Sequence, residues 1–265
     1  MKNTIQVKFG DLWKLGYHLL LCGDSSEEAM VSAILGRKKP RLMVTDPPYG
    51  VSYTTFNRKD PRRKPSDDDL KKNLADIKLR NDHRTNWSKT FFLSQAQIAY
   101  VWHPSAVPDV AMQALRDGMY NVRQSIVWAK NRATLSRSAY HWAHESCLYA
   151  VRAGETANWV GDRKQRTLWN EPVPEPKERI HPTQKAIGLY LRPIQNHTDP
   201  KEFVYDPFAG SGVVFAACEE TGRRALGIEM DEEYCSRILQ RFESISRKQI
   251  KFVKNVFDSN LSTSA

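Results

Sequence analysis

A short run with chemical potential, Asp46-Pro47-Pro48-Tyr49, directly follows the apolar residues 42–45. Proline restricts the preceding residue to extended conformations and has no N–H to donate, so the run is stiff and its carbonyl oxygens are available as acceptors. The Asp46 carboxylate and the Pro47 carbonyl can together hold both hydrogens of an aromatic amine. The nitrogen can then become pyramidal and direct its lone pair at a methyl donor. A rigid turn with a capping Asp is the structural alternative.

Tyr49 adds an aromatic ring to this run. Stacking of a nucleobase on such a ring contributes roughly 1–3 kcal/mol. The amine of a base in a duplex is inside a base pair, so the base has to leave the helix before this chemistry is possible.

A second candidate site follows residues 203–205, where the chain reads Asp206-Pro-Phe-Ala-Gly-Ser-Gly before a helix-compatible run. A strand, a Gly-rich turn and a helix let backbone N–H groups approach a ligand. The dinucleotide fingerprint fails because Phe215 stands at its third glycine, and no G-K-[ST] follows for a P-loop. The remaining interpretation is a nucleoside cofactor with a charged amino-acid group. Asp206 would hold its ammonium and Glu229 its ribose hydroxyls, unless these are an ordinary turn and a helix-capping acid.

The elements that must position these residues alternate along the chain. Short apolar runs predict strands at 18–22, 42–45, 98–102, 124–128, 146–151, 203–205 and 225–228. Helical patterns lie between several of them. The clearest is 231–246, where Asp231 caps the start and Tyr234, Ile238, Phe242 and Ile245 mark an apolar face. The alternation predicts a doubly wound α/β sheet with ligands at the carboxyl ends of its strands.

Charge and composition divide the chain into one predicted catalytic domain, 1–257, with loop insertions. Residues 57–89 form a highly charged loop, 154–180 a short basic and aromatic segment, and 258–265 a disordered tail. The net charge of +10 favours an acidic partner such as nucleic acid. Solvated surface loops are the simpler interpretation of both charged segments.

The segment 130–145 interleaves basic and aromatic residues, as phosphate contact and base stacking require. Its Tyr140 and Trp142 fit a core position equally well. His144 and Glu145 do not form an HExxH zinc site, because Leu148 replaces the second His. We expect them to be a hydrogen-bonded pair that orders the loop.

The four cysteines, Cys22, Cys147, Cys218 and Cys235, have no metal-binding spacing, so we expect no metal site and reduced, buried thiols. The N-terminus lacks an apolar signal region and no run reaches membrane-spanning length. These features predict a cytoplasmic protein, bacterial or phage-encoded.

Three motifs in order, DPPY, HPTQK at 181–185 and DPFAGSG, resemble the permuted, beta-type S-adenosylmethionine-dependent DNA amino-methyltransferases. The resemblance extends from about residue 19 to 242. It implies a circularly permuted, seven-stranded Rossmann-like sheet. The implied catalytic loop is Asp46, Pro47, Pro48 and Tyr49. The residues implied for S-adenosylmethionine are Asp24 and Ser25 at its adenine, Glu229 at its ribose, Asp206, Phe208, Gly210 and Gly212 at its methionine part, and Thr183, Gln184 and Lys185 at a covering helix.

The chain departs from this family at two places. Ala186 follows HPTQK where the family usually has proline, which removes a residue suited to a first helical turn. Val213 and Val214 stand where Thr-Thr is common, so hydroxyls that could contact the cofactor are absent.

The motifs therefore predict a site-specific DNA methyltransferase acting on N6 of a flipped-out adenine. Cytosine N4 offers the same geometry and is the main alternative, although Asp before Pro-Pro-Tyr favours adenine in this family. A non-catalytic DNA-binding module is a second alternative, which the intact Asp46 and Asp206 oppose. A protein glutamine methyltransferase has the reverse motif order and begins its loop with Asn, and Phe215 disfavours a nicotinamide oxidoreductase. The expected partner is double-stranded DNA. The sequence does not decide whether the protein forms a homodimer or has a restriction partner. Residues 154–180 lie where the family places its target-recognition segment.

Overall fold

The computed structural model describes residues 5–48, 86–134, 139–174, 185–246 and 248–258. Its strands form one ten-stranded sheet in the order β10-β1-β2-β9-β8-β3-β4-β6-β5-β7. The strands are β1 Asp11–Leu15, β2 His18–Cys22, β3 Leu42–Thr45, β4 Ile98–His103, β5 Tyr120–Thr134, β6 Trp142–Arg152, β7 Leu168–Asn170, β8 Phe203–Asp206, β9 Arg224–Glu229 and β10 Ile250–Asn255. The helices are α1 Glu28–Leu35, α3 Ser88–Ser94, α4 Pro108–Asp117, α5 Gly188–His197, α6 Val213–Thr221 and α7 Glu232–Ser246.

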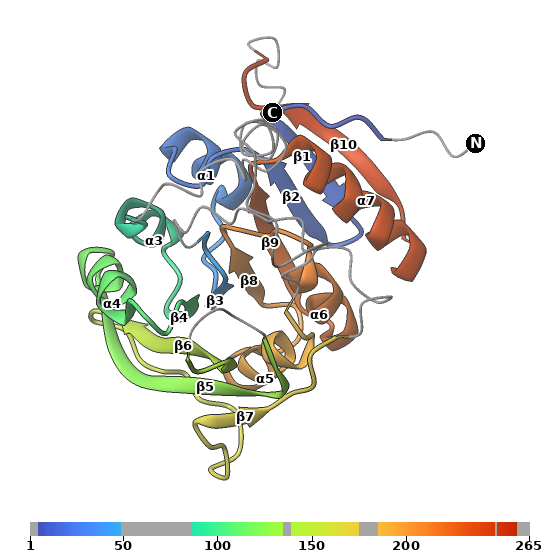
Figure 1. The fold of residues 1–265 in the computed structure, drawn as a ribbon. Coiled ribbons are helices and arrows are strands. Elements are labelled where there is room, and N and C mark those ends of the chain that lie inside the picture. The colour runs from blue at the N-terminus through green and yellow to red at the C-terminus, as the bar shows by residue number, and fades with distance from the viewer. Residues whose placement is uncertain (1–4, 49–85, 135–138, 175–184, 247, 259–265) are drawn as a thin grey trace, which may run out of the picture.

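The centre of the sheet is parallel. Strands β2, β9, β8, β3 and β4 pair parallel to one another in that order, whereas β6 is antiparallel to both β4 and β5. Helices α1, α3 and α4 cover one face of the sheet and α5, α6 and α7 cover the other (Figure 1). Each face has its own buried apolar cluster, so the fold is a three-layer, doubly wound α/β sandwich of the Rossmann-like kind. The predicted fold class is confirmed.

All seven predicted strands are present, and they are consecutive in the sheet from β2 to β5. The sheet has ten strands rather than seven, because β1 and β10 extend one edge and β7 extends the other. Strand β1 lies between β10 and β2 and is largely buried, yet it was not predicted. The two outermost strands lacked a usable signal: β7 has three residues, and β10 is exposed or half-buried along its length. An edge strand that buries little apolar surface has little hydrophobic pattern to detect.

Helix α7 follows the prediction at its start and departs from it at its end. Asp231 caps the helix, since its Oδ1 accepts from the Glu233 and Tyr234 backbone N–H groups at 2.8 and 3.1 Å. The buried face is Cys235, Ile238, Leu239 and Phe242. Ile245, assigned to that face from the sequence, is 52% exposed.

The predicted loops and termini are only partly described. Of the charged loop 57–89, residues 57–85 lie outside the described residues, and the last two belong to α3. The segment 154–180 contributes β7, which pairs parallel with β5. The tail 258–265 lies outside the described residues beyond Asp258.

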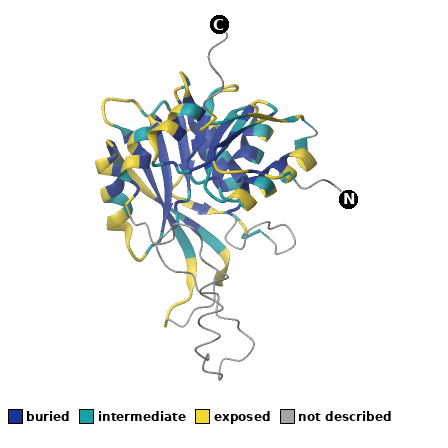
Figure 2. Cartoon of the chain, turned by 90° about the horizontal axis from the view of Figure 1, so that it is seen from above, coloured by how far each residue is buried: buried dark blue, intermediate teal, exposed yellow. Residues whose placement is uncertain are grey.

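Burial is greatest along the centres of the strands, and exposed residues gather on the outer sides of the helices and in the loops (Figure 2). The four cysteines are free and buried, as predicted. Within the described ranges, no helix has the length and apolar character needed to cross a membrane.

Candidate active site

Four of the parallel strands bring the predicted acidic residues together at the carboxyl end of the sheet. Asp46 follows β3, Asp206 ends β8 and Glu229 ends β9, while Asp24 lies two residues after β2. Strand β3 pairs with β8 through Leu42↔Val204 and Met43↔Tyr205. The strands that precede the two motifs therefore lie side by side. Carboxyl ends of parallel strands are where open α/β sheets bind ligands.

Asp206 is the junction between the two motifs. Its Oδ1 accepts from the Thr45 hydroxyl at 2.7 Å and from the Phe208 backbone N–H at 3.1 Å. Its Oδ2 accepts from the Tyr190 hydroxyl of α5 at 3.4 Å. The side chain is fully buried, and this burial raises its pKa to about 7, against the opposing effect of the Thr45 and Phe208 donors. The nearby Asp46 and Glu229 carboxylates raise this pKa further.

Glu229 joins the Gly-rich turn to the start of α7. One carboxylate oxygen accepts from the Gly210 N–H at 2.7 Å and the other from the Asp231 N–H at 2.9 Å. Burial is the largest cause that raises its pKa to about 7, and these two backbone donors oppose it. A carboxylate has about four lone-pair sites, so acceptor capacity remains for ribose hydroxyls.

The Gly-rich turn depends on backbone that only glycine adopts easily. Gly210 and Gly212 have φ of +52° and +75°, and a Cβ on Gly212 would lie 3.0 Å from Ile238. A Cβ on Gly210 would meet only the Phe208 carbonyl, at 3.8 Å, so space lies in front of this part of the turn. Phe215 fills the position of the missing third glycine by packing on Gly227, where a Cβ would be 2.6 Å from its ring.

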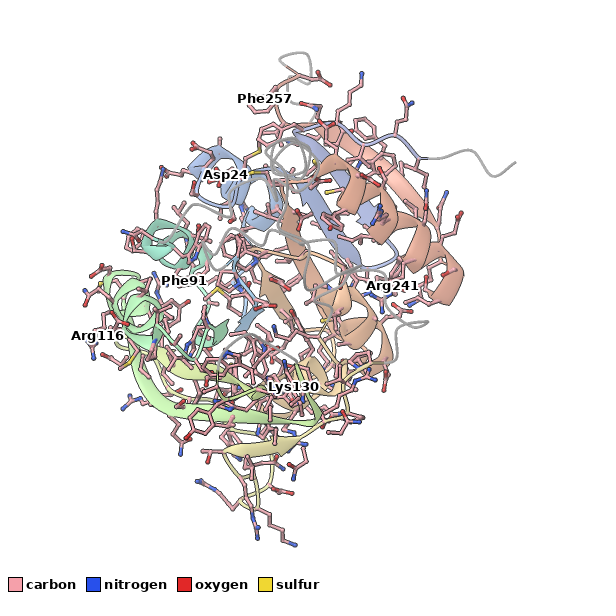
Figure 3. The ribbon with its side chains drawn as sticks, in the orientation of Figure 1. Asp24, Phe91, Arg116, Lys130, Arg241 and Phe257 are labelled. Atoms are coloured by element: carbon pink, nitrogen blue, oxygen red, sulfur yellow. The ribbon has the colours of Figure 1, made fainter. Side chains whose placement is uncertain are left out.

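Asp24 and Ser25 lie between β2 and α1. The Asp24 Oδ1 accepts from the Ser26 N–H at 2.8 Å, so the carboxylate stabilises the turn into the helix. Asp24 is half-buried and Ser25 is buried. Figure 3 labels Asp24 beside α1. Their contact with the cofactor adenine stays a prediction.

Asp46 is half-buried and paired with Lys185, whose Nζ lies 2.5 Å from its Oδ2. The same ammonium lies 2.8 Å from Glu145 Oε2 on β6, and Glu145 Oε1 lies 2.6 Å from Lys130 Nζ on β5. Lys185 therefore contacts the candidate catalytic carboxylate directly. Its expected role beside the cofactor is not tested by these contacts.

The expected pairing of His144 with Glu145 is wrong. Glu145 is held by the two lysines, whereas the His144 ring lies against Trp142, with centroids 5.7 Å apart. Successive residues of a strand point to opposite faces, so these neighbours on β6 cannot share one environment.

Several expected site residues lie outside the described ones: Tyr49, Thr183 and Gln184. Pro47 is buried and Pro48 half-buried after β3, and Phe208 packs edge-on against Trp87 at 4.8 Å. Val213 and Val214 are buried in the core at the start of α6.

Sequence reasoning missed four residues as part of this site, since their contacts join distant segments: Thr45, Tyr190, Glu145 and Lys130.

The β5–β6 pair extends away from the core. Trp142 is 43% exposed and Tyr140 88% exposed, so neither aromatic ring is a core residue. Arg132 on β5 is exposed too, and its guanidinium donates to the Pro174 carbonyl at 3.2 Å. Basic and aromatic side chains therefore share this projecting region, which suits contact with nucleic acid.

The fold is that of a Rossmann-like α/β protein, with a candidate ligand site at the carboxyl ends of β2, β3, β8 and β9. Residues 41–241 match the family model described as DNA methylase, which represents N6 and N4 enzymes. The chain belongs to this DNA methylase family.

Two curated relatives illustrate this similarity. The putative methylase YubD of Escherichia coli K12 is 30% identical over 145 residues, 52% of this chain and 59% of that protein. The type II methyltransferase M2.DpnII of Streptococcus pneumoniae is 23% identical over 230 residues, 79% of this chain and 86% of that protein. The match thus spans little more than half of YubD and most of M2.DpnII.

Solved structures share the fold. A complex of M1.HpyAVI with SAM has a TM-score of 0.60 at 22% identity, covering 84% of this chain and 98% of that one. The cytosine-N4-specific PvuII DNA methyltransferase has a TM-score of 0.58 at 14% identity, covering 90% and 95%.

Proposed function

We propose that this chain is an S-adenosylmethionine-dependent DNA methyltransferase that methylates N6 of an adenine flipped out of double-stranded DNA. The observation that carries the proposal is the adjacency of β3 and β8. This pairing brings Asp46 of the Asp-Pro-Pro-Tyr run and Asp206 of the Gly-rich motif to one edge of the sheet. Membership of the DNA methylase family supports it.

The residues present fit the cofactor. Glu229 offers a partly exposed carboxylate for the ribose hydroxyls, and the left-handed turn at Gly210 leaves space for a ligand beside backbone N–H groups. Asp206 is buried behind this turn, so its charge favours a cationic ligand there. When bound, S-adenosylmethionine supplies the electrophilic methyl group. M1.HpyAVI, which shares the fold, is known as a complex with SAM.

Asp46 and the Pro47 carbonyl hold the two hydrogens of the target amine in this proposal. The amine loses conjugation with its ring as the nitrogen becomes pyramidal, and positive charge develops on it during transfer. The Asp46 carboxylate stabilises this charge more strongly in the transition state than in the ground state, which is what accelerates a reaction. Tyr49 stacks on the extrahelical base.

The order of the motifs, with Asp46 before Asp206, leads us to propose that the chain is a circularly permuted member of its fold class. We place one catalytic domain at 1–257, with target recognition at 154–180. The exposed Arg132, Tyr140 and Trp142 contribute to the DNA surface.

Cytosine-N4 methylation is the second candidate, and a specific observation favours it. The PvuII enzyme, which is cytosine-N4-specific, shares this fold over 90% of the chain. Both targets present an exocyclic amine to the same carboxylate, so the ends of β3 and β8 serve either reaction.

One experiment separates the candidates. DNA without modified bases is incubated with the purified protein and S-adenosylmethionine, digested to nucleosides and analysed by mass spectrometry. We expect N6-methyladenine. N4-methylcytosine would replace the adenine assignment, and DNA binding without either product would establish a non-catalytic module.

A further inference from the structure

Lys185 is buried between two carboxylates. Its Nζ lies 2.5 Å from Asp46 Oδ2 and 2.8 Å from Glu145 Oε2. Burial by itself lowers the pKa of a lysine, but the two carboxylates raise the pKa of Lys185 above its usual value. Lys185 is therefore an ammonium ion that donates hydrogen bonds and cannot take a proton from the substrate.

The ion pairs continue away from Asp46. Glu145 Oε1 lies 2.6 Å from Lys130 Nζ, which gives an alternating series of negative and positive groups. Burial raises the pKa of Glu145, yet the two lysines lower it below its usual value. The series links the loop after β3, the segment before α5, and strands β6 and β5 (Figure 3, where Lys130 is labelled beside α5).

Two tryptophan rings lie beneath the lysines. Lys185 Nζ is 5.6 Å from the centroid of the Trp102 ring, and Lys130 Nζ is 5.2 Å from that of Trp128. The two rings contact each other edge to face at 6.2 Å. The two tryptophan rings exclude water from one side of the lysines, and this strengthens the ion pairs that the lysines form.

This arrangement restricts the orientation of the Asp46 carboxylate. An Asp at the end of a strand rotates about two side-chain bonds, and an ammonium on Oδ2 limits this rotation. A lysine paired with Asp46 alone would also oppose the positive charge that develops on the target nitrogen. Glu145 offsets that effect, because it shares the Lys185 charge.

We propose that Lys185 is a positioning residue for Asp46, and that Glu145 sets how strongly Lys185 holds it. This inference rests on the proposed methyl transfer and deepens it. It differs from the role expected for Lys185 beside the cofactor, and the two roles predict opposite kinetic results.

The test compares Lys185→Met with the wild-type protein in methyl transfer to DNA and in calorimetric cofactor binding. A positioning role predicts a kcat lower by roughly 10²-fold, since a small displacement of a catalytic group has an effect of that size. It also predicts cofactor affinity within about twofold of wild type. Lys185→Arg should recover part of the rate. Ethylammonium ions should restore part of the activity of Lys185→Ala, which a general folding defect would prevent.

Glu145→Gln supplies a second, independent readout. It should lower kcat when Lys185 is present, because the lysine then loses the Glu145 carboxylate that shares its charge. In the Lys185→Met background Glu145→Gln should have no further effect on kcat, since Glu145 acts on Asp46 through Lys185. Lys248→Met is the matched control: Lys248 also forms an ion pair, with Glu219 at 2.5 Å, away from this edge, and it should leave kcat unchanged.

The outcomes are distinct. If the wild-type protein is active and Lys185→Met keeps the wild-type kcat, the inference about Lys185 is wrong and the proposed function stands. The same holds if Lys185→Met binds the cofactor more weakly with an unchanged kcat. A wild-type protein that transfers no methyl group to DNA overturns the proposed function and the inference with it.

Discussion

The Thr45 hydroxyl donates a 2.7 Å hydrogen bond to Asp206 Oδ1, across 161 residues of chain. Both residues are fully buried and each ends its strand, so the bond lies where β3 and β8 leave the sheet. One residue precedes the candidate catalytic Asp46 and the other begins the Gly-rich motif. The bond therefore joins the candidate catalytic loop to the candidate cofactor turn.

Thr45→Val should destabilise the fold and weaken cofactor binding. Valine keeps the shape but leaves a buried carboxylate without one donor, which costs on the order of 1–3 kcal/mol. Chemical denaturation and calorimetry measure the two effects. Thr90→Val is the control, because the buried Thr90 hydroxyl has no hydrogen-bond partner among the residues that the structure describes, and its replacement should be neutral or stabilising. Equal effects of the two substitutions would contradict the role of Thr45.

Cofactor affinity should rise between pH 6 and 8. The pKa values of Asp206 and Glu229 are each raised to about 7, so both groups are partly protonated near neutrality. A cationic ligand favours their ionised forms, and binding then releases protons near pH 7. Calorimetry in buffers of different ionisation enthalpy measures this release. Glu229→Gln should reduce it, and a release unchanged in that variant would exclude Glu229 from the site.

Asp206→Asn should stabilise the protein while weakening cofactor binding. The pKa of Asp206 is raised above its ordinary value of 3.8, so the folded state binds this proton more tightly than the unfolded state. Its contribution to stability is complete at low pH and is lost as pH rises through about 7. Asparagine avoids this loss. The free energy of unfolding of Asp206→Asn should therefore exceed that of the wild type by on the order of 1–4 kcal/mol, since a pKa shift of one unit corresponds to about 1.4 kcal/mol.

Denaturation at several pH values checks this expectation. The advantage of Asp206→Asn should grow from about pH 4, near the ordinary pKa of 3.8, and level off above about pH 8, where Asp206 is ionised. A variant that is less stable than wild type at pH 8 would show that the carboxylate charge supports the fold.

Asp46→Ala should abolish methyl transfer and leave folding and cofactor binding largely intact. Removing one preorganised polar partner typically lowers the rate by about 10²–10³, and Asp46 also orients the amine. Asp46→Asn keeps the shape and one acceptor oxygen and should retain a trace of activity. Single-turnover rates and calorimetry measure both properties. Asp199→Ala, an exposed Asp in the connection between α5 and β8, is the control. A near wild-type rate in Asp46→Ala would refute the catalytic assignment.

DNA binding should weaken steeply with salt, because lysine and arginine release counterions from phosphates. Arg132→Ala should lower the salt slope by about 1, whereas Trp142→Ala should cost roughly 1–3 kcal/mol of stacking with little change in slope. Fluorescence anisotropy at several salt concentrations separates the two. Lys251→Ala, on the opposite edge strand β10, should behave as wild type. If Lys251→Ala alone lowered the salt dependence of DNA binding, the DNA-binding surface would lie near β10 and not near Arg132.

The sequence alone was sufficient for the main strands and for the edge of the sheet that carries the candidate site. The strands before Asp46 and Asp206 are short, apolar and buried, with Pro-Pro or Gly-rich turns after them, and such local patterns depend on neighbouring residues. The predicted doubly wound sheet places its ligands at the carboxyl ends of such strands. The edge strands β7 and β10 were missed, because short or partly exposed strands carry little hydrophobic pattern. Strand β1 lies between β10 and β2 and is largely buried, so this reason does not apply to it.

Only the tertiary structure decided which side chains meet. Thr45 reaches Asp206, and Lys185, which the HPTQK motif implies at a helix covering the cofactor, lies between Asp46 and Glu145. No local pattern encodes these pairings, since each joins strands or loops that become neighbours only when the sheet forms. The strengths of these contacts, and the pKa values they produce, follow from burial in the assembled core, where charges lose water and depend on the partners that the fold supplies.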